Sequence, residues 1–421
     1  MISYFNKIKK HTFIMQVATL MSGSAISQGI MFAATPFLTR LYNVEEFGVF
    51  ALYLSIIGPL SVISSWRYET AIMLPKNNED AKALLYLSIF ISILMSFLMY
   101  ILILIFHDEI LLHLTDKIGI FLWIVPLGVL VSGFYQIFNA WNTRNELYGN
   151  ISQSMILRST TAIGIQLSSK SILNLSGGLV LGNFLASLIA TLYLVRKAIK
   201  TNTLRLTNIS IDSIKKNGKV YDKFPKYQSF ASFINSVSVN LPIILLSSLY
   251  SLEIAGYYAL TNRVLMVPVS LISGSIRNVY YQKASKKFMA EESIKSLYIK
   301  TTLNLFKIGV IPFFLVAFFA EPLFINLFGQ EWLISAIFYQ ILFVWAIMLF
   351  INPPATSTVL ILGFQKFSLV FTVLSLLLRA LALYIGYIVY NDYYISIGLY
   401  ACIGVLLNVF IITYILKKIP H

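Results

Sequence analysis

Apolar residues in this chain form twelve long runs that are separated by short polar or charged turns. Most runs contain about 20 residues or more, enough for an α-helix with a rise of about 1.5 Å per residue to cross a bilayer core about 30 Å thick. We therefore predict an all-α polytopic membrane protein with about twelve transmembrane helices. The predicted spans cover approximately residues 13–38, 47–73, 83–106, 118–140, 150–169, 177–196, 228–249, 255–281, 301–320, 331–352, 367–390 and 394–416.

Part of the pattern occurs twice along the chain. Residues 42–52 (YNVEEFGVFAL) align with residues 250–260 (YSLEIAGYYAL) at an offset of 208, and the tyrosine, one glutamate, the glycine, the alanine and the leucine are identical. In both copies a proline and then an arginine follow, and the sequence from Ser154 to Arg158 likewise matches that from Ser375 to Arg379. The chain is predicted to be a duplicated bundle. Because each copy has an even number of spans, a pseudo-two-fold axis along the membrane normal should relate the copies.

The longest polar segment lies between the sixth and seventh runs and is rich in lysine. It predicts an N-terminal six-helix bundle of residues 1–197, a basic linker of residues 198–226 and a C-terminal six-helix bundle of residues 227–421. The linker is expected to be a solvated tether that meets anionic lipid headgroups on the cytoplasmic side. Trp123, Trp141 and Trp332 are expected to anchor helix ends at the membrane interface.

Composition supports this class. Hydrophobic residues make up 58% of the chain and charged residues 12%, and the mean hydropathy is +0.78, which leaves too few polar residues to coat a soluble globule. Most of the lysines and arginines behind the net charge of +15 fall on the side of the N-terminus. The excess predicts cytoplasmic termini and needs no nucleic-acid partner. Cys402 is the single cysteine, so no intrachain disulfide can form.

One arginine lies inside an apolar run. Arg263 falls within residues 255–281, and an ionised guanidinium that faced lipid there would cost at least about 2.5–3.5 kcal/mol. It should therefore face protein or a water-filled cavity. Ser270, Gly274 and Arg277 follow it at i+7, i+11 and i+14, on the same helix face. We predict a helix that is polar on one side.

The fifth span of each half carries a second pair of arginines. Ser368, Thr372, Ser375 and Arg379 form a stripe at i, i+4, i+7 and i+11, so Arg379 should point into protein. Arg158 is its counterpart in the first half. We predict that Arg263, Arg379 and Arg158, together with Ser270 and Ser375, bind an anionic group.

Arg67 and Glu69 lie near the inner end of the second predicted span. Because residues two apart point in different directions on a helix, the two side chains are not expected to pair. Glu69 is the one carboxylate that the pattern places within a span. Arg67, Glu69 and Arg277 are the candidates for a gate or for coupling to H⁺ or Na⁺.

Five short motifs stand in or beside these spans: Arg67-Tyr-Glu69-Thr-Ala-Ile-Met-Leu-Pro75, Phe224-Pro225, Leu241-Pro242, Gly256-Tyr-Tyr-Ala-Leu260 and Arg263-Val-Leu-Met-Val-Pro268. In these motifs the chain resembles the polysaccharide (O-antigen or capsular repeat-unit) flippases of the multidrug/oligosaccharidyl-lipid/polysaccharide exporter superfamily. The similarity covers nearly the whole chain. The resemblance implies two six-helix bundles in a V around a central cationic cavity that opens alternately to each side of a bacterial inner membrane.

It also implies a substrate, an oligosaccharide linked through pyrophosphate to a polyprenyl lipid, which moves from the cytoplasmic to the periplasmic leaflet. Other polysaccharide assembly proteins are expected partners, besides the membrane lipids. No bound cofactor and no metal are expected, and the membrane potential, H⁺ or Na⁺ would supply the energy. One alternative is a drug/cation antiporter of the same superfamily, which would place carboxylates in the membrane. Another is a membrane glycan polymerase or ligase, which would need a longer outer loop.

Overall fold

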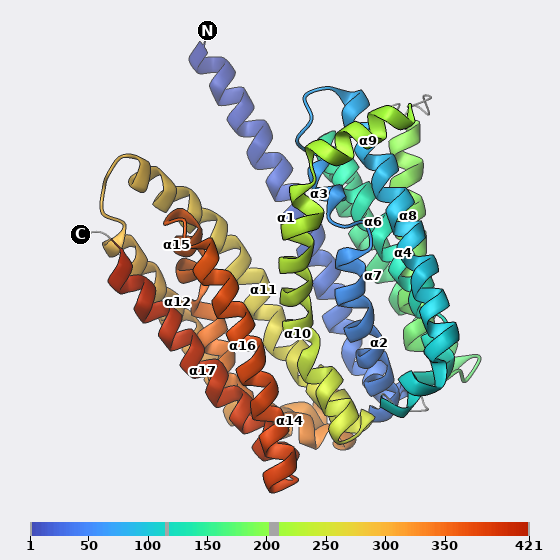
Figure 1. Cartoon of the computed structure of the whole chain (residues 1–421). Helices are drawn as coiled ribbons and strands as arrows, with labels where there is room; N and C mark the ends of the chain where they lie inside the picture. The colour runs from blue at the N-terminus through green and yellow to red at the C-terminus, as the bar shows by residue number, and fades with distance from the viewer. Residues whose placement is uncertain (1, 114–117, 202–209, 420–421) are drawn as a thin grey trace. The chain divides into compact units, whose positions relative to one another are not determined.

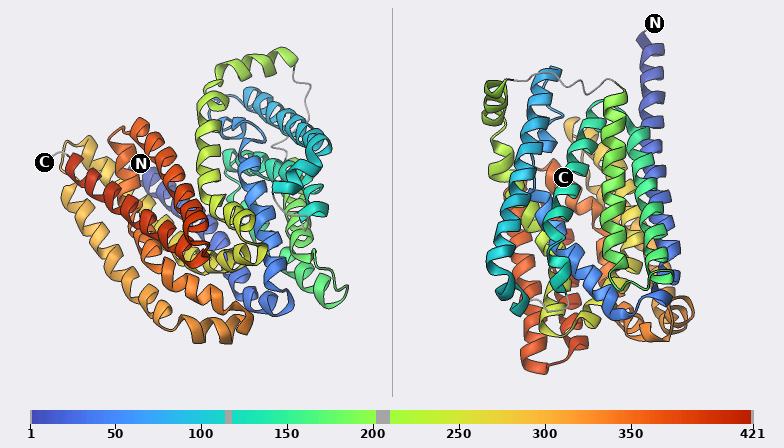
Figure 2. Two further views of the ribbon diagram at one scale, coloured as in Figure 1. Left: turned by 60° about the horizontal axis from the view of Figure 1, so that its bottom comes forward. Right: turned by 90° about the vertical axis from the view of Figure 1, so that its right-hand side faces the viewer.

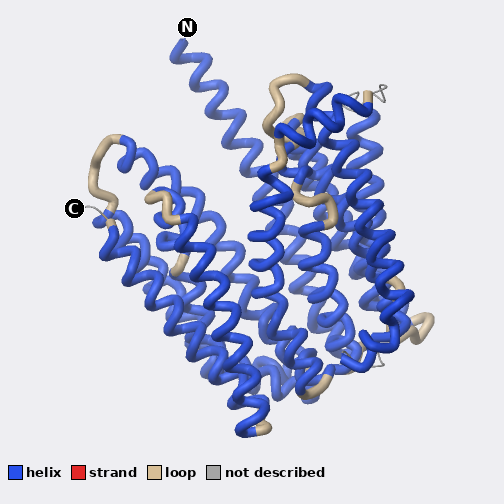
Figure 3. Tube along the Cα trace, in the orientation of Figure 1, coloured by secondary structure: helices blue, strands red, loops and turns tan. Residues whose placement is uncertain are grey.

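A computed structural model of the chain describes residues 2–113, 118–201 and 210–419. Within these ranges the chain forms helices joined by loops and turns (Figure 3). Each of the twelve predicted spans corresponds to one long helix, and Figures 1 and 2 show these helices from three sides. The long helices are α1 (Ile2–Leu41), α2 (Val44–Ile63), α4 (Asn78–His113), α6 (Val125–Arg144), α7 (Tyr148–Ser171), α8 (Gly178–Lys200), α10 (Ser229–Leu249), α11 (Leu252–Met289), α12 (Lys295–Phe318), α14 (Leu333–Ile351), α16 (Gln365–Ile385) and α17 (Tyr393–Lys418).

Short helical segments complete the described chain. They are α3 (Tyr68–Ala71), α5 (Gly119–Leu122), α9 (Ile211–Val220), the π-helical turn Phe224–Gln228, α13 (Ala320–Phe328), the 3₁₀ turn Gln330–Trp332, α15 (Pro353–Ile361) and the π-helical turn Gly386–Tyr390.

Nine helical stretches of the described residues are long and apolar enough to cross a membrane. The long helices α1, α6 and α7 are not among them. In α7, serine, threonine and glutamine replace many apolar residues, and neighbouring helices satisfy their polar groups. The Gln166 amide donates to Leu179 O of α8 at 3.1 Å, and Ser27 Oγ of α1 donates to Met155 O of α7 at 3.1 Å. Small and hydrogen-bonding residues at helix contacts are typical of helices packed within membranes.

The chain folds into two compact units. Unit 1 comprises residues 1–42 and 53–240, and unit 2 comprises residues 43–52 and 241–421. The first turns of α2 therefore belong to unit 2. The first half of α10, up to Asn240, belongs to unit 1. The domain boundaries after residues 197 and 226 remain predictions from the sequence.

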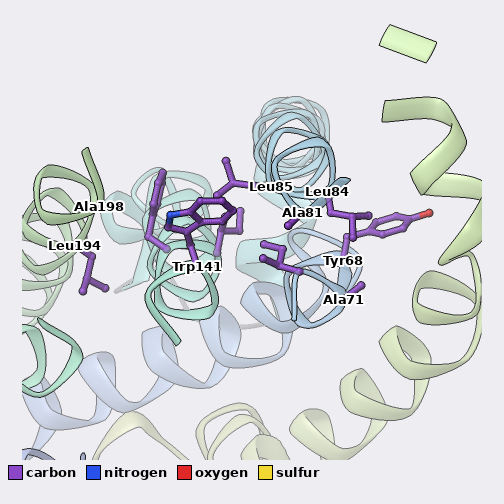
Figure 4. Packing of buried hydrophobic residues seen from close by; sticks show 11 residues of the cluster. Tyr68, Ala71, Ala81, Leu84, Leu85, Trp141, Leu194 and Ala198 are labelled. Carbon is purple, nitrogen blue, oxygen red and sulfur yellow. The ribbon is translucent and has the colours of Figure 1, made fainter. Parts of the chain in front are cut away.

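The core of unit 1 includes a cluster where α3, α4, α6 and α8 meet (Figure 4). Trp141 of α6 lies in this cluster and is 1% exposed, between Leu194 of α8 and Leu85 of α4. In unit 2, Trp332 is fully buried and its ring meets the edge of Phe47 at 5.0 Å between centroids. The prediction that Trp141 and Trp332 are interfacial anchors is therefore wrong, because both indoles fill the interior of a bundle.

The second predicted span ends earlier than expected. Helix α2 stops at Ile63, and Trp66 and Arg67 then adopt left-handed backbone conformations with φ of 50° and 61°. This turn separates α2 from the four-residue helix α3, so the prediction of one helix to residue 73 is wrong. Left-handed backbone is costly for residues other than glycine. Tertiary contacts of the loop sustain it: Arg144 Nη1 donates to Ile72 O at 2.9 Å, and Tyr68 Oη donates to Gly218 O at 2.9 Å.

Part of the basic linker also folds. Ser210 caps α9 by accepting a hydrogen bond from the Ser213 amide, and α9 lies across the end of the unit 1 bundle at which α4 begins (Figure 1). The Asn217 amide donates to Asp80 Oδ1 at 2.8 Å and fixes α9 to α4. The expectation of a solvated tether is therefore wrong for residues 211–220, while residues 202–209 lie outside the described ranges.

In unit 2 the two copies of the sequence repeat pack against each other. Asn43 and Ser251, which align in the repeat, each cap a helix: Asn43 Oδ1 accepts from the Glu46 amide at 2.8 Å, and Ser251 Oγ accepts from the Ile254 amide at 3.3 Å. The two helix starts then pack backbone to backbone. A Cβ on Gly48 would lie 1.9 Å from Leu252 O, and a Cβ on Gly256 would lie 2.3 Å from Val44 O. Both glycines of the repeat are required by one reciprocal contact.

Candidate functional site

In unit 2, Arg379 is surrounded by aromatic rings from three helices. Its Cζ lies 5.7 Å from the ring centroid of Trp345 on α14 and 5.7 Å from that of Tyr400 on α17. The two rings meet edge to face at 5.4 Å, and Tyr258 of α11 adds a third ring at 6.4 Å from Tyr400. All three aromatic side chains are buried. We call Arg379, Trp345, Tyr400 and Tyr258 the unit 2 arginine cluster.

Polar atoms in and beside this cluster lack partners. Arg379 Nε, Trp345 Nε1 and Ser375 Oγ are buried and form no hydrogen bond with any described residue. Ser375 lies one helical turn before Arg379 on α16, as its spacing predicted. A buried donor without a partner costs about 1–3 kcal/mol. These atoms leave hydrogen-bonding capacity unused at this point in the bundle.

Unit 1 contains a matching arrangement. Arg158 Cζ of α7 lies 5.4 Å from the ring centroid of Tyr135 on α6, and the buried Tyr53 of α2 is within electrostatic range of Arg158. The Tyr135 hydroxyl is 3.2 Å from Ser154 Oγ, on the turn of α7 that precedes Arg158. Arg158, Tyr135, Tyr53 and Ser154 form the unit 1 arginine cluster. In both units an arginine of the fifth long helix lies over an aromatic ring of the fourth.

Neither arginine is neutralised. Among the described residues, no carboxylate lies within ion-pair distance of Arg158 or Arg379. The reason is the distribution of acidic residues: each one in the described ranges lies at or near a helix end, in a short helix or in a turn. A guanidinium that stacks on aromatic faces keeps its edge N–H groups available for hydrogen bonds. Each cluster can therefore donate to an anionic group, and phosphate oxygens fit the planar donor fork.

The polar stripe predicted on the eighth span lies on α11. This helix continues through Pro268 and keeps Arg263, Ser270, Gly274 and Arg277 on one face. Arg263 is partly buried, whereas Ser270 and Arg277 are exposed, and a Cβ on Gly274 would meet nothing within 4 Å. Arg263 and Arg379 belong to unit 2, whereas Arg158 belongs to unit 1, so the predicted site residues are divided between the two units.

The sequence of the chain matches a known family. The family model described as polysaccharide biosynthesis protein aligns with residues 37–337, which include both repeat copies and the unit 1 arginine cluster. The chain belongs to this family. No curated protein matches the sequence.

Several solved structures share the fold of this chain. The chain is similar to lipid II flippase MurJ in its inward closed conformation, with a TM-score of 0.76 and 13% identity over 97% of this chain and 88% of that one. It is also similar to a MOP superfamily transporter from Pyrococcus furiosus, with a TM-score of 0.65 and 12% identity over 96% of this chain and 95% of that one. For the inward-facing conformation of a MATE family transporter of the MOP superfamily the TM-score is 0.63, with 14% identity over 95% of both chains. The predicted resemblance to a polysaccharide family and the predicted fold of two helical bundles are confirmed.

In this member of the polysaccharide biosynthesis family, Arg67 and Glu69 form an ion pair, contrary to the sequence-based expectation. Arg67 Nη1 lies 3.2 Å from Glu69 Oε1, because the left-handed turn at Arg67 removes both residues from a common helix. Ser65 Oγ also donates to Glu69 Oε2 at 2.5 Å. Glu69 is 3% exposed and lies between the candidate spans, not inside one. Burial raises the pKa of the Glu69 carboxyl, and the Ser65 hydrogen bond and the Arg67 charge oppose the rise.

Replacing Arg67 by glutamine should destabilise unit 1. The substitution leaves the Glu69 carboxylate buried without its counter-charge, at an expected cost of about 1–3 kcal/mol. The loss should be largest above the raised pKa of Glu69 and should shrink as the pH falls through it, because the protonated carboxyl needs no counter-charge. Thermal unfolding of the purified protein between pH 5 and 8 measures this effect. The variant R67Q/E69Q should recover part of the stability, and an unchanged Tm in R67Q at every pH would contradict the pairing.

Sequence reasoning missed the aromatic residues of both clusters. The chain contains 25 tyrosines and 5 tryptophans, so composition does not single out the ones in the clusters. These are Tyr53, Tyr135, Tyr258, Trp345 and Tyr400. One signal was present. The arginines recur at paired positions, and a guanidinium inside an apolar bundle without nearby acids requires either hydrogen-bond acceptors or aromatic faces.

Proposed function

We propose that this protein is a flippase that moves a polyprenyl-pyrophosphate-linked oligosaccharide, the repeat unit of an O-antigen or similar polysaccharide, across a bacterial inner membrane. Movement runs from the cytoplasmic to the periplasmic leaflet by alternating access. Membership of the polysaccharide biosynthesis family supports the glycan. The fold supports transport, since one structure with this fold is a lipid II flippase.

The observation that carries the proposal is the pair of arginine clusters. Each holds a positive charge inside a bundle without an acidic neighbour among the described residues, which favours anionic cargo. The substrate lipid has a polar, anionic head and a tail that can stay in the acyl region of the bilayer. Moving such a head requires fixed positive charge that offsets the desolvation of its pyrophosphate. Arg379, Arg158 and Arg263 are proposed to supply this charge, and Ser375 and Ser270 to add polar contacts.

The electrical potential can drive the transfer. With the cytoplasm negative, an anion that moves outward descends the gradient by about 2.3 kcal/mol per charge per 100 mV. A coupling ion is therefore not required, although Glu69 with its raised pKa is the proposed proton-binding residue if one is used.

The distribution of carboxylates separates this function from that of a drug/cation antiporter. A cationic cargo calls for buried acids within the spans, and the described acidic residues lie outside the middle of the long helices. The described connections between helices are also short, which gives a glycan polymerase or ligase no catalytic loop within the described ranges.

Proteoliposomes containing the purified full-length chain can test the function. We expect a fluorescent polyprenyl-pyrophosphate oligosaccharide, loaded in the inner leaflet, to become accessible to membrane-impermeant periodate, and faster when the outside is positive. Ethidium uptake driven by a pH gradient should be absent. Proton-driven ethidium transport without movement of the lipid-linked glycan would overturn the proposal in favour of an antiporter.

A further inference from the structure

Tyrosine side chains gather at the end of unit 2 at which α17 begins. The Tyr250 ring, between α10 and α11, packs edge to face with Tyr387 at 5.2 Å and with Tyr393 at 6.0 Å between centroids. Phe338 of α14 lies between Tyr393 and Tyr394 of α17 and Tyr257 of α11, at 5.9–6.5 Å from each ring. We call Tyr250, Tyr257, Tyr387, Tyr393 and Tyr394 the unit 2 tyrosine cluster.

This cluster has ring surface and hydroxyl groups available for a ligand. Its five residues are partly exposed, whereas the aromatic residues of the unit 2 arginine cluster are buried. The Tyr250 hydroxyl is 2.6 Å from Ser396 Oγ, but the hydroxyls of Tyr257 and Tyr387 form no hydrogen bond with any described residue. A tyrosine combines an apolar ring with a polar tip. Such groups suit a sugar, which has C–H groups on the faces of its ring and hydroxyls at the rim.

The charge around the cluster disfavours phosphate as its ligand. The carboxylates of Glu253, Glu331 and Asp392 each lie within electrostatic range of at least one of the five hydroxyls. The segments that carry these acids and the tyrosines, residues 249–258, 328–338 and 385–396, contain no lysine or arginine. Carboxylates repel an anion but accept hydrogen bonds from hydroxyl groups. A neutral, hydroxylated ligand therefore fits this end of unit 2 better than a phosphate or an anionic lipid headgroup.

The tyrosine cluster continues the line of the unit 2 arginine cluster along α17. Tyr393 precedes Tyr400 by seven residues, so both lie on one face of the helix, about 10 Å apart along its axis. Tyr257 directly precedes Tyr258, the third ring of the arginine cluster. The tyrosines lie toward the end of unit 2 that is opposite to the C-terminus in Figure 1. This separation is one that a pyrophosphate and the sugars next to it can span.

The order of the two clusters matches the order of groups in the proposed cargo. The positive-inside rule predicts that the end of unit 2 with the tyrosines faces the periplasm. A lipid that enters the periplasmic leaflet has its pyrophosphate at the bilayer surface and its sugars further out, in water. Arg379 lies deeper along α16 than Tyr387, so the cation comes first and the tyrosines follow on the periplasmic side.

We propose that the unit 2 tyrosine cluster binds the sugars of the lipid-linked oligosaccharide whose pyrophosphate is held at Arg379, an inference that rests on the proposed function. The rings of Tyr387 and Tyr393 pack against C–H faces of the sugars. The hydroxyls of Tyr257 and Tyr387 donate to sugar oxygen atoms, and the nearby carboxylates accept from sugar hydroxyls. Because such packing needs an apolar face and not one pattern of hydroxyls, the site selects glycosylated lipid over bare lipid.

Native mass spectrometry of the full-length protein in detergent tests the site with two probes. One is undecaprenyl pyrophosphate, and the other is the same lipid carrying a disaccharide of N-acetylglucosamine. The wild type should bind the glycosylated probe more tightly. One neutral hydrogen bond corresponds to a factor of about 2–10, so Y257F/Y387F should bind the glycosylated probe about 4- to 100-fold more weakly and the bare probe unchanged. Y387L should weaken binding of the glycosylated probe more than Y387F, because it also removes the ring.

Two variants serve as controls. Y100F removes the hydroxyl of a partly exposed tyrosine near the end of α4 that is also predicted to be periplasmic, and it should leave the binding of both probes unchanged. R379Q should weaken the binding of both probes. Y257F/Y387F should keep the Tm of the wild type, because it retains both rings, and this separates lost binding from lost folding.

The outcomes separate the sugar site from the function on which it rests. If the wild type bound both probes equally, or if Y257F/Y387F kept the wild-type preference, the tyrosines would only pack the end of the bundle. In that case weaker binding of both probes by R379Q would still support the flippase. If the wild type bound neither probe, the proposed function would be wrong, and the sugar site with it.

Discussion

Replacing Arg379 by glutamine should reduce translocation of the lipid-linked oligosaccharide by about 10- to 100-fold at equal membrane abundance. The expectation follows from the loss of charge-assisted hydrogen bonds to pyrophosphate, which contribute about 1.5–3 kcal/mol. Lysine at this position should retain part of the activity, because it keeps the charge but loses the planar fork that stacks on Trp345 and Tyr400. Arg158→Gln should have an effect in the same direction, since Arg158 occupies the corresponding position in unit 1. The proteoliposome assay with impermeant periodate measures the rates.

The control for this series is Arg196→Gln. Arg196 is an exposed arginine of α8 that lies outside both clusters, so its loss should leave translocation unchanged. Thermal unfolding of each variant separates transport from packing. If Arg379→Gln translocated the substrate at the wild-type rate, the assignment of cargo charge to this site would be wrong; a lowered Tm with that rate would identify Arg379 as a packing residue of the aromatic cluster.

Replacing Gly48 or Gly256 by alanine should destabilise the protein by about 1–3 kcal/mol. The added Cβ would overlap a backbone carbonyl oxygen in each case, Leu252 O or Val44 O, and a backbone cannot move aside as a flexible side chain can. The overlap should outweigh the gain in helix propensity, which is at most about 1 kcal/mol. Lower Tm and lower abundance in the membrane measure the effect.

Two comparisons sharpen this prediction. Gly274→Ala on α11 adds the same methyl group where nothing lies within 4 Å, so it should preserve or raise the Tm. G48A/G256A should cost less than the sum of the single variants, because both glycines serve one contact and a shift that relieves one overlap relieves the other. Wild-type stability in both single variants would mean that the two helix starts do not meet backbone to backbone.

The repeat is the part of the sequence that gave the most structural information. Each copy of the repeat has a glycine, Gly48 or Gly256, where the other helix start leaves no room for a Cβ. Each copy also has a residue that caps its helix, Asn43 or Ser251. Arg379 was predicted to face protein, and it lies over the buried rings of Trp345 and Tyr400. Its counterpart Arg158 lies over the partly buried ring of Tyr135. Such features can be found from the sequence because duplication places the same physical requirement at two positions of the chain.

Other features depended on contacts between residues far apart in sequence. The ion pair of Arg67 and Glu69 arises from a left-handed turn that hydropathy does not signal, and Arg144 and Tyr68 hold the loop that contains it. Helix α9 is held on α4 by the hydrogen bond from Asn217 to Asp80, which are 137 positions apart. In each case a local pattern allowed several conformations, and a distant partner selected one.

By itself, the sequence determined that this is a helical membrane protein with two copies of one bundle, because hydrophobic length and internal repetition are properties of the chain alone. It also determined that the bundles contain arginines with few acids to neutralise them. Only the tertiary structure decided which aromatic rings receive those arginines, where α2 ends and which tyrosines meet at the end of unit 2. These outcomes depend on side-chain packing between helices, and twelve similar apolar runs do not specify which of their residues meet.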